Sequence, residues 1–270
     1  MPDSIPYILG HADAELRRLE LQSVCLRPIT RRMLVEAGVA RGMRVLDFGC
    51  GNGEVSLLAA ELVGPSGAVL GVDRSAEAVA AARERAAALA VHNVTFVQGD
   101  ETFREPAAFD MAVGRYVLLH QASPARLIQA MAESVRPGGT VAFHEPTLRG
   151  ENPTWPALPP LTVMWEALVA AFGSVLQHPD SGSRLVEHFQ QAGMSLPTVF
   201  CEAPAGGGPE SPIYAWYAAT LRNVVPQLER IGWRRPDVDR LEESLAEAAT
   251  AARGQILGPL QFCGWSRVPN

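Results

Sequence analysis

Short apolar runs alternate with longer segments whose apolar residues recur every three or four positions, starting at residue 44. The runs predict β-strands at 44–47, 68–72, 94–98, 109–113 and 140–144. The longer segments predict amphipathic helices at 53–63, 75–90 and 124–135. Because strands joined through helices pair in parallel with right-handed crossovers, this pattern predicts an α/β fold. Helices should cover both faces of a mostly parallel sheet.

The segments on either side of this alternation are mainly helical. An amphipathic helix begins after Asp13-Ala14-Glu15, and we expect Pro28 to interrupt it before a second helix over 30–38. Pro137-Gly138-Gly139 should end the helix at 124–135. Five prolines between Pro146 and Pro160 predict a long surface excursion. Beyond it, the pattern predicts helices at 161–176, 183–192, 212–230 and 237–252, and strands at 197–201 and 259–268 that extend one edge of the sheet.

Composition and charge exclude several classes of function. The net charge of −6 argues against a nucleic-acid partner, because nothing attracts the chain to phosphate backbones. All 23 basic residues are Arg, so a lysine Schiff base is excluded. The four cysteines form no CxxC pair, which predicts no metal site, no disulfide framework and a reducing, cytoplasmic setting. No signal peptide or membrane span is expected, and we expect a monomer or a homodimer.

A glycine-rich turn, Asp47-Phe48-Gly49-Cys50-Gly51-Asn52-Gly53, follows the first predicted strand. Glycine tolerates positive φ and lets a ligand approach the backbone closely. The dinucleotide fingerprint would require glycine at position 54, where this chain has Glu54. A carboxylate there fits poorly against a pyrophosphate on the helix N-terminus. The turn therefore suits a ligand without phosphate.

Acidic residues follow the first three strands, where the carboxyl ends of a parallel sheet form a binding crevice. Asp47 ends the first strand, Asp73 ends the second, and Asp100 and Glu101 follow the third. Asp73 can accept both hydroxyls of a ribose, and Asp100 can accept an exocyclic adenine amine. The alternatives are a helix cap at Asp73 and solvated turn acids at Asp100 and Glu101.

These motifs resemble the class I S-adenosylmethionine (SAM)-dependent methyltransferases. The resemblance runs from about Arg41 to Glu145 and is carried by VLDFGCGNGE at 45–54, VLGVDRS at 69–75, VQGDE at 97–101, and FDMAVGRYVLLH followed by RPGGTVAF. It implies a Rossmann-like sheet of seven strands, mostly parallel with an antiparallel last strand, and a helical cap. It also implies SAM as cofactor, with S-adenosylhomocysteine as product. The implied parts are an N-terminal helical lid at 1–40, a SAM-binding core at 41–145, and at 146–270 a cap insertion with C-terminal strands completing the same domain.

The resemblance assigns a set of residues to the cofactor. The three turn glycines would line its methionine and ribose, Asp73 would take the ribose, and Asp100 or Glu101 the adenine. Arg115 would stand near the methionine end, and Tyr7 and His11 would fold over the cofactor as part of a lid. The complete predicted set is Tyr7, Asp47, Gly49, Gly51, Gly53, Asp73, Arg74, Asp100, Glu101 and Arg115.

Methyl transfer needs an acceptor in line with the S–CH₃ bond, and an oxygen acceptor gains from a base of near-neutral pKa. His120 and His144 lie at the carboxyl edge, and Glu145 could orient His144. Either histidine could instead bond to backbone at a strand end. Aromatic residues of the cap could line an acceptor pocket or simply pack together: Trp155, Trp165, Phe172, Tyr214, Trp216 and Tyr217.

The predicted activity is methyl transfer, most simply O-methylation of a small or medium-sized hydrophobic metabolite in secondary metabolism. Two alternatives stay open. One is a pericyclase or cyclase in which bound SAM acts electrostatically without turnover. The other is a non-catalytic, SAM-binding regulatory protein.

Overall fold

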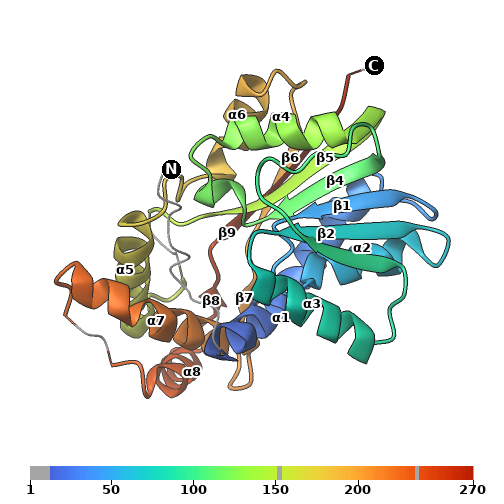
Figure 1. Cartoon of the computed structure of the whole chain (residues 1–270). Helices are drawn as coiled ribbons and strands as arrows, with labels where there is room; N and C mark the ends of the chain where they lie inside the picture. The colour runs from blue at the N-terminus through green and yellow to red at the C-terminus, as the bar shows by residue number, and fades with distance from the viewer. Residues whose placement is uncertain (1–12, 151–153, 235–236, 270) are drawn as a thin grey trace. The chain divides into compact units, whose positions relative to one another are not determined.

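A computed structural model describes residues 13–150, 154–234 and 237–269 of the chain (Figure 1). The chain divides into two compact units. The first, which we call the helical unit, comprises residues 1–26, 148–179 and 203–260. The second, the sheet unit, comprises residues 27–147, 180–202 and 261–270. Each unit is described by itself below.

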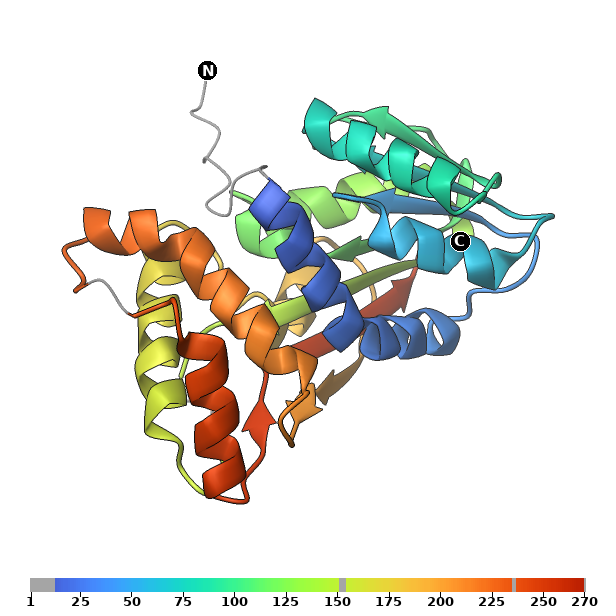
Figure 2. The same cartoon turned by 90° about the horizontal axis from the view of Figure 1, so that it is seen from below.

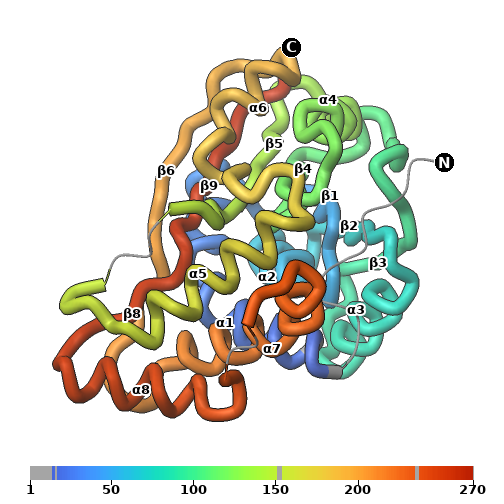
Figure 3. The backbone as a smooth tube through the Cα atoms, turned by 90° about the vertical axis from the view of Figure 1, so that its left-hand side faces the viewer, coloured from blue at the N-terminus to red at the C-terminus, as the bar shows by residue number. Residues whose placement is uncertain are grey.

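A seven-stranded sheet forms the centre of the sheet unit, in the order β3-β2-β1-β4-β5-β9-β6 (Figure 3). The strands are β1 (Arg44–Phe48), β2 (Ala68–Asp73), β3 (Val94–Gln98), β4 (Phe109–Arg115), β5 (Val135–Thr147), β6 (Thr198–Glu202) and β9 (Leu260–Arg267). The first five pair in parallel with their neighbours. The predicted α/β fold with a mostly parallel sheet is confirmed, and the order reverses between β1 and β4, where ligands bind in such folds.

Helices cover both faces of this sheet, as predicted. In Figure 1, α4 (Pro124–Ser134) and α6 (Leu185–Gln191) lie on one face, whereas α2 (Glu54–Val63) and α3 (Ala76–Ala88) lie on the other. Ser75 caps α3 by accepting a hydrogen bond from the amide of Ala78. Pro124 occupies the first turn of α4, where its missing N–H costs nothing. A three-residue 3₁₀ helix, η1 (Leu118–His120), follows β4.

The two late strands extend the sheet beyond β5, as the apolar runs predicted. β6 pairs antiparallel with β9. At the start of β5, Gly138 and Gly139 exchange backbone hydrogen bonds with Val268, just after the end of β9. At the other end of β5, the side chain of His144 meets that of Gln261 near the start of β9. Strand β9 therefore runs antiparallel to β5, as the resemblance implied.

Pro28 does not interrupt the first helix, and that prediction is wrong. Helix α1 (Asp13–Glu36) continues through Pro28. A proline inside a helix costs about 3 kcal/mol. Ile29, Met33 and Leu34 are buried in the same helix, and each contributes roughly 1.5–3 kcal/mol on burial. Because Pro28 itself is exposed, the Val24 carbonyl that loses its partner can be hydrated. Burial of the apolar face therefore outweighs the lost bond.

Pro137-Gly138-Gly139 also acts differently from the prediction. Helix α4 already ends at Ser134, and Val135 pairs with Phe109 in the sheet. The register then jumps to Met111 opposite Thr140, so the intervening residues bulge out of the β4 ladder and bond to Val268 instead. The three residues therefore lie in a strand bulge, and β5 is longer than the predicted run at 140–144.

The helical unit packs three helices beside one another (Figure 2). These are α5 (Pro159–Gly173), α7 (Pro212–Arg230) and α8 (Leu241–Ala251), and a two-stranded ribbon of β7 (Ala205–Gly206) and β8 (Ile256–Leu257) accompanies them. The helices correspond to three of the predicted segments, whereas the short ribbon was not predicted. Among the described residues, no helix is long and apolar enough to cross a membrane.

The buried carboxyl group of Glu145 fixes the chain where it leaves β4 in the sheet unit. Glu145, near the end of β5, accepts hydrogen bonds from the amides of Val117 at 2.7 Å, Leu118 at 2.9 Å and Leu119 at 3.3 Å. These amides belong to the first turn of η1 and would otherwise lack partners. Burial raises the pKa of Glu145 to about 8, against the opposing effect of the three amides.

This shift predicts a pH dependence of stability. The native state holds the proton of Glu145 up to about pH 8, whereas the unfolded state releases it near its ordinary pKa of 4.5. The free energy of unfolding should therefore fall between pH 4.5 and 8, by at most about 1.4 kcal/mol per pH unit. Glu145→Gln should lose less stability across this range. Urea unfolding of both proteins at several pH values tests this, and parallel pH curves would contradict it.

Candidate cofactor and acceptor site

The glycine turn after β1 is a tight backbone structure that only glycine fits easily. Gly49, Gly51 and Gly53 have φ of +70°, +52° and +83°. The amides of Gly49 and Cys50 both donate to the carbonyl of Val72, at 2.8 and 3.0 Å. The turn is therefore joined to β2 by its own backbone.

The three glycines differ in what surrounds them. A Cβ on Gly49 would lie 2.3 Å from Val117 Cγ1, and a Cβ on Gly53 would lie 2.9 Å from Phe96 Cζ. A Cβ on Gly51 would meet no heavy atom of the described residues within 4 Å. Packing therefore requires glycine at 49 and 53, whereas Gly51 opens onto space that a ligand can use.

Asp73 links the end of β2 to this open position. Its Oδ2 accepts the amide of Gly51 at 2.9 Å, and its Oδ1 accepts the amide of Ser75 at 2.9 Å. The capping role in α3 belongs to Ser75. A carboxylate offers about four acceptor positions, so each oxygen of Asp73 retains the capacity for a further donor such as a ribose hydroxyl.

Asp47, the first residue of the turn, is only 1% exposed. Its carboxylate accepts a 2.5 Å hydrogen bond from the hydroxyl of Ser56 on α2. Burial raises its pKa to about 7, against the lowering effects of the Ser56 hydroxyl and the Arg115 charge. In the described structure, Asp47 holds the turn to α2 rather than facing solvent.

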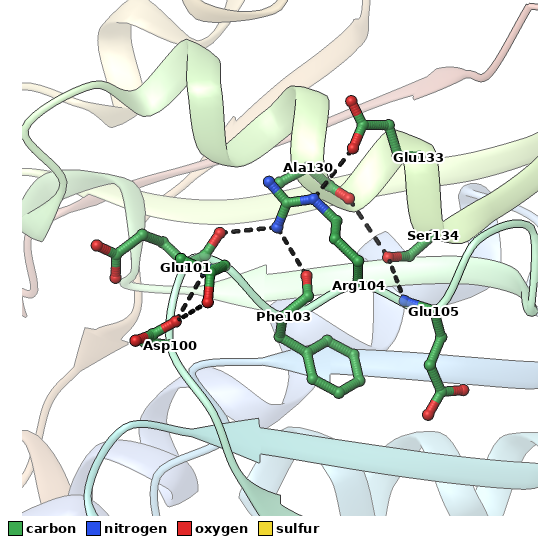
Figure 4. A network of polar contacts seen from close by, with 9 residues as sticks. Asp100, Glu101, Phe103, Arg104, Glu105, Ala130, Glu133 and Ser134 are labelled. Carbon is green, nitrogen blue, oxygen red and sulfur yellow. Dashed lines mark hydrogen bonds and ion pairs between the residues drawn. The ribbon is translucent and has the colours of Figure 1, made fainter.

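Asp100 and Glu101 form an exposed turn after β3 (Figure 4). Asp100 accepts hydrogen bonds from the hydroxyl and the amide of Thr102, and these bonds lower its pKa. Arg104 donates to the carbonyl of Glu101 and pairs with Glu133 of α4. The turn is thus tied to the sheet unit, and it presents an ionised carboxylate.

The structure does not test the assignments of three other predicted residues. Arg74 is exposed, and its carbonyl accepts a hydrogen bond from the Gln98 side chain. Tyr7 and His11 lie outside the described residues. Their assignments stay predictions.

His144 is fully buried, and both ring nitrogens are engaged. Nδ1 lies 2.9 Å from Thr30 Oγ1, and Nε2 lies 3.0 Å from Gln261 Oε1. Burial and, to a smaller extent, the nearby Arg115 charge lower its pKa to about 3, against the opposing effect of the hydrogen bond to Gln261. Glu145 bonds to the η1 amides, so it does not orient this imidazole. His144 is therefore a neutral group that supports the structure and that a substrate cannot reach, so it does not act as the base.

Arg115 and His120 bracket the loop after β4. Arg115 is half-buried, and its Nη1 donates to Thr30 Oγ1 at 3.3 Å. His120 is half-buried at the end of η1. Thr30, Tyr116 and Gln261 were missed by the sequence reasoning. No local sequence pattern predicts that they meet, because they lie far apart in the sequence, in α1, after β4 and in β9.

The residues at the carboxyl ends of β1, β2 and β3 fit an adenosine ligand. The open backbone at Gly51 and the Asp73 carboxylate beside it come from neighbouring strand ends in the crossover region. The ionised Asp100 follows the next strand along.

Comparisons with known proteins agree with this fit. The Methyltransferase domain family matches residues 40–193, more than half of the chain. The chain is 31% identical over 191 residues to the aklanonic acid methyltransferase DauC of Streptomyces sp. (strain C5), covering 64% of this chain and 86% of that protein. Several other curated relatives are matched over about half of their length.

Two solved structures show the same fold. One is the phosphoethanolamine N-methyltransferase 2 of Haemonchus contortus, solved with S-adenosylhomocysteine; it has a TM-score of 0.55 and 19% identity over 90% of this chain and 53% of that chain. The other is the [4+2]-cyclase SpnF, with a TM-score of 0.52 and 20% identity over 90% of this chain and 81% of that chain. Sheet order, glycine turn and family match agree, and the chain belongs to the class I SAM-dependent methyltransferases.

Proposed function

We propose that the protein transfers the methyl group of SAM to an oxygen of a small or medium-sized hydrophobic metabolite of secondary metabolism. The proposed substrate class rests on the 31% identity to a methyltransferase named for aklanonic acid. The matched region covers 86% of that relative. The acidic net charge of −6 supports a small molecule over a nucleic acid.

In this proposal the sheet unit binds the cofactor. Asp73 accepts the ribose hydroxyls, Asp100 accepts the adenine amine, and the Gly51 backbone lets the cofactor lie close to the turn. SAM supplies a methyl group on a sulfonium, which is a strong electrophile. The chain then has to orient the acceptor and exclude water, which can account for most of the acceleration.

The helical unit is rich in aromatic side chains. Trp216 and Tyr217 of α7 stack at 5.8 Å with an interplanar angle of 9°. Trp165, Phe172 and Tyr214 are also buried, whereas Trp155 is exposed.

Two of these aromatics carry polar atoms that lack partners. Tyr214 Oη and Trp216 Nε1 are buried and have no hydrogen-bond partner among the described residues.

If a base assists, His120 is the better of the two predicted histidines, because it is half-buried whereas His144 is inaccessible. The fold is shared with a [4+2]-cyclase, so it does not separate methyl transfer from the cyclase alternative. The products of the reaction separate them.

The cofactor site is tested by Gly51→Ala. The added methyl group would fill the open position and strain a residue at φ +52°, so affinity for S-adenosylhomocysteine should fall by about tenfold or more. Gly193→Ala is the matched control, because Gly193 also has positive φ (+73°) and open surroundings in the same unit. Calorimetric titration measures both. Equal affinities in the two variants would remove Gly51 from the site.

Methyl transfer is tested with SAM labelled in the methyl group and a panel of small and medium-sized hydrophobic metabolites that carry hydroxyl or carboxyl groups. Label should enter the product in step with S-adenosylhomocysteine. His120→Gln should slow this transfer by about tenfold or more without weakening cofactor binding. Conversion of a substrate with no label transfer would support the cyclase. Cofactor binding with no product from any acceptor would support the regulatory alternative.

A further inference from the structure

The sheet of the sheet unit ends in two edge strands, β3 on one side and β6 on the other (Figure 3). An edge strand presents unpaired backbone N–H and C=O groups, so it can pair with a strand of another chain. Proteins protect such edges with charged side chains or with elements that cover them. The two edges of this sheet differ in that protection.

The edge of β3 is protected by an arginine. The amide of Gly99, just after β3, donates to the carbonyl of Asp73 in β2. Because backbone groups alternate in direction along a strand, the carbonyl of Phe96 faces the open edge. Arg83 of α3 donates to this carbonyl from Nε at 3.1 Å and from Nη2 at 2.6 Å. A side chain therefore occupies an acceptor that a further strand would need.

The outer edge of β6 lacks such protection. Within residues 13–150, 154–234 and 237–269, no side chain bonds to the backbone of Thr198–Glu202, and no strand pairs with its outer side. The charged side chain of the strand, Glu202, pairs with Arg32 of α1. The backbone groups of this edge are therefore available for pairing.

The two faces of β6 are covered differently. On one face, the guanidinium of Arg32 lies 4.2 Å from the centroid of the Phe200 ring and pairs with Glu202. Side chains alternate between the faces of a strand, so Val199 and Cys201 project from the other face. Both are exposed. An open edge and an exposed apolar face therefore occur on the same strand.

Helix α6 adds an apolar side chain near this exposed face. Gly264 of β9 pairs with Val199, and a Cβ on Gly264 would lie 3.1 Å from Leu185 Cδ1, so α6 covers β9 on the face of Val199. Val186 of α6 is 43% exposed, and Leu196, just before β6, is 66% exposed. Apolar side chains beside an open edge favour association.

We propose that β6 is a dimer interface, at which β6 of a second copy of this chain pairs antiparallel across a two-fold axis at Phe200. This inference is independent of the proposed function. The register that pairs all five residues of β6 sets Thr198 opposite Glu202, Val199 opposite Cys201, and Phe200 opposite its own copy. In it a hydroxyl can donate to a carboxylate, apolar side chains meet, and no like charges face each other.

The two-fold symmetry is what makes a second copy fit this edge. A two-fold contact uses the same patch on both chains, so each favourable pair occurs twice. The axis lies perpendicular to the sheet, which keeps both copies of α6 on one face. The exposed face of Val199 and Cys201 then continues into that of the second copy, and the two sheets join into one. The sequence leaves a monomer and a homodimer open, and this interface selects the homodimer.

Val199→Glu tests the interface. The wild-type chain should sediment as a dimer, with twice the chain mass of 29.0 kDa. Val199→Glu places two carboxylates on one face about 7–8 Å apart across the axis, and it should raise the dimer dissociation constant by about tenfold or more. Adding Cys201→Lys should restore the dimer, because each new carboxylate then faces an ammonium of the other copy. Sedimentation equilibrium of the full chain measures all three proteins.

Thr95→Glu is the matched control, because Thr95 is an exposed residue of the other edge strand, β3. It should leave the dissociation constant unchanged. Circular dichroism shows that each variant is folded.

Val199→Cys tests the register without introducing a charge. The new thiol would face the native Cys201 of the other copy at a Cα separation of about 4.5–5.5 Å, which a disulfide spans. Mild oxidation should therefore give a covalent dimer. Val199→Cys combined with Cys201→Ser should give none, because the two new thiols lie on a diagonal of about 7–8 Å.

The opposite results would overturn the interface. A wild-type chain that stays monomeric at every concentration measured would do so. A dimer that Val199→Glu does not weaken, or that Thr95→Glu weakens equally, would place the contact elsewhere. A covalent dimer that forms equally well with Cys201→Ser present would overturn the register.

Discussion

The site in the sheet unit depends on the hydrogen bond from the Gly51 amide to the Asp73 carboxylate. It joins the turn after β1 to the end of β2, at the one turn glycine whose added Cβ would meet no heavy atom of the described residues within 4 Å. The other glycines are confined by Val117 and Phe96, so the backbone at Gly51 cannot move far without disturbing packed side chains. The acid that would hold a ribose is therefore the acid that fixes the backbone beside it.

Buried side chains around this hydrogen bond hold the neighbouring loops in place. Asp47 and Ser56 hold the turn to α2. Glu145 and the hydrogen bonds from Thr30 to Gln261 hold the loop after β4. From its position at the carboxyl edge of the sheet, His144 was predicted to be a catalytic base. Because it is fully buried and makes two hydrogen bonds, it is instead a neutral residue that supports the structure. Pre-organised backbone and fixed polar groups suit a reaction that depends mainly on orientation.

Features encoded locally could be predicted from the sequence. The strand positions and the glycine turn depend on neighbouring residues, and they lie where expected. The predictions made from Pro28 and Pro137 were wrong because contacts distant in sequence outweigh the local effect of proline. At Pro28 the contact is the buried face of helix α1, and after Pro137 it is the pairing of Gly138 and Gly139 with Val268. Thr30 and Gln261 could not be found, because a hydrogen bond between residues more than a hundred positions apart leaves no pattern in one sequence.

We propose that Asp73 would hold the ribose of SAM while it holds the turn. Asp73→Asn keeps the size of the side chain and an acceptor oxygen, but it replaces the other oxygen with a donor that cannot accept a ribose hydroxyl. Calorimetric titration with S-adenosylhomocysteine should show affinity reduced by about tenfold or more. Unchanged affinity in a folded Asp73→Asn protein would contradict the account.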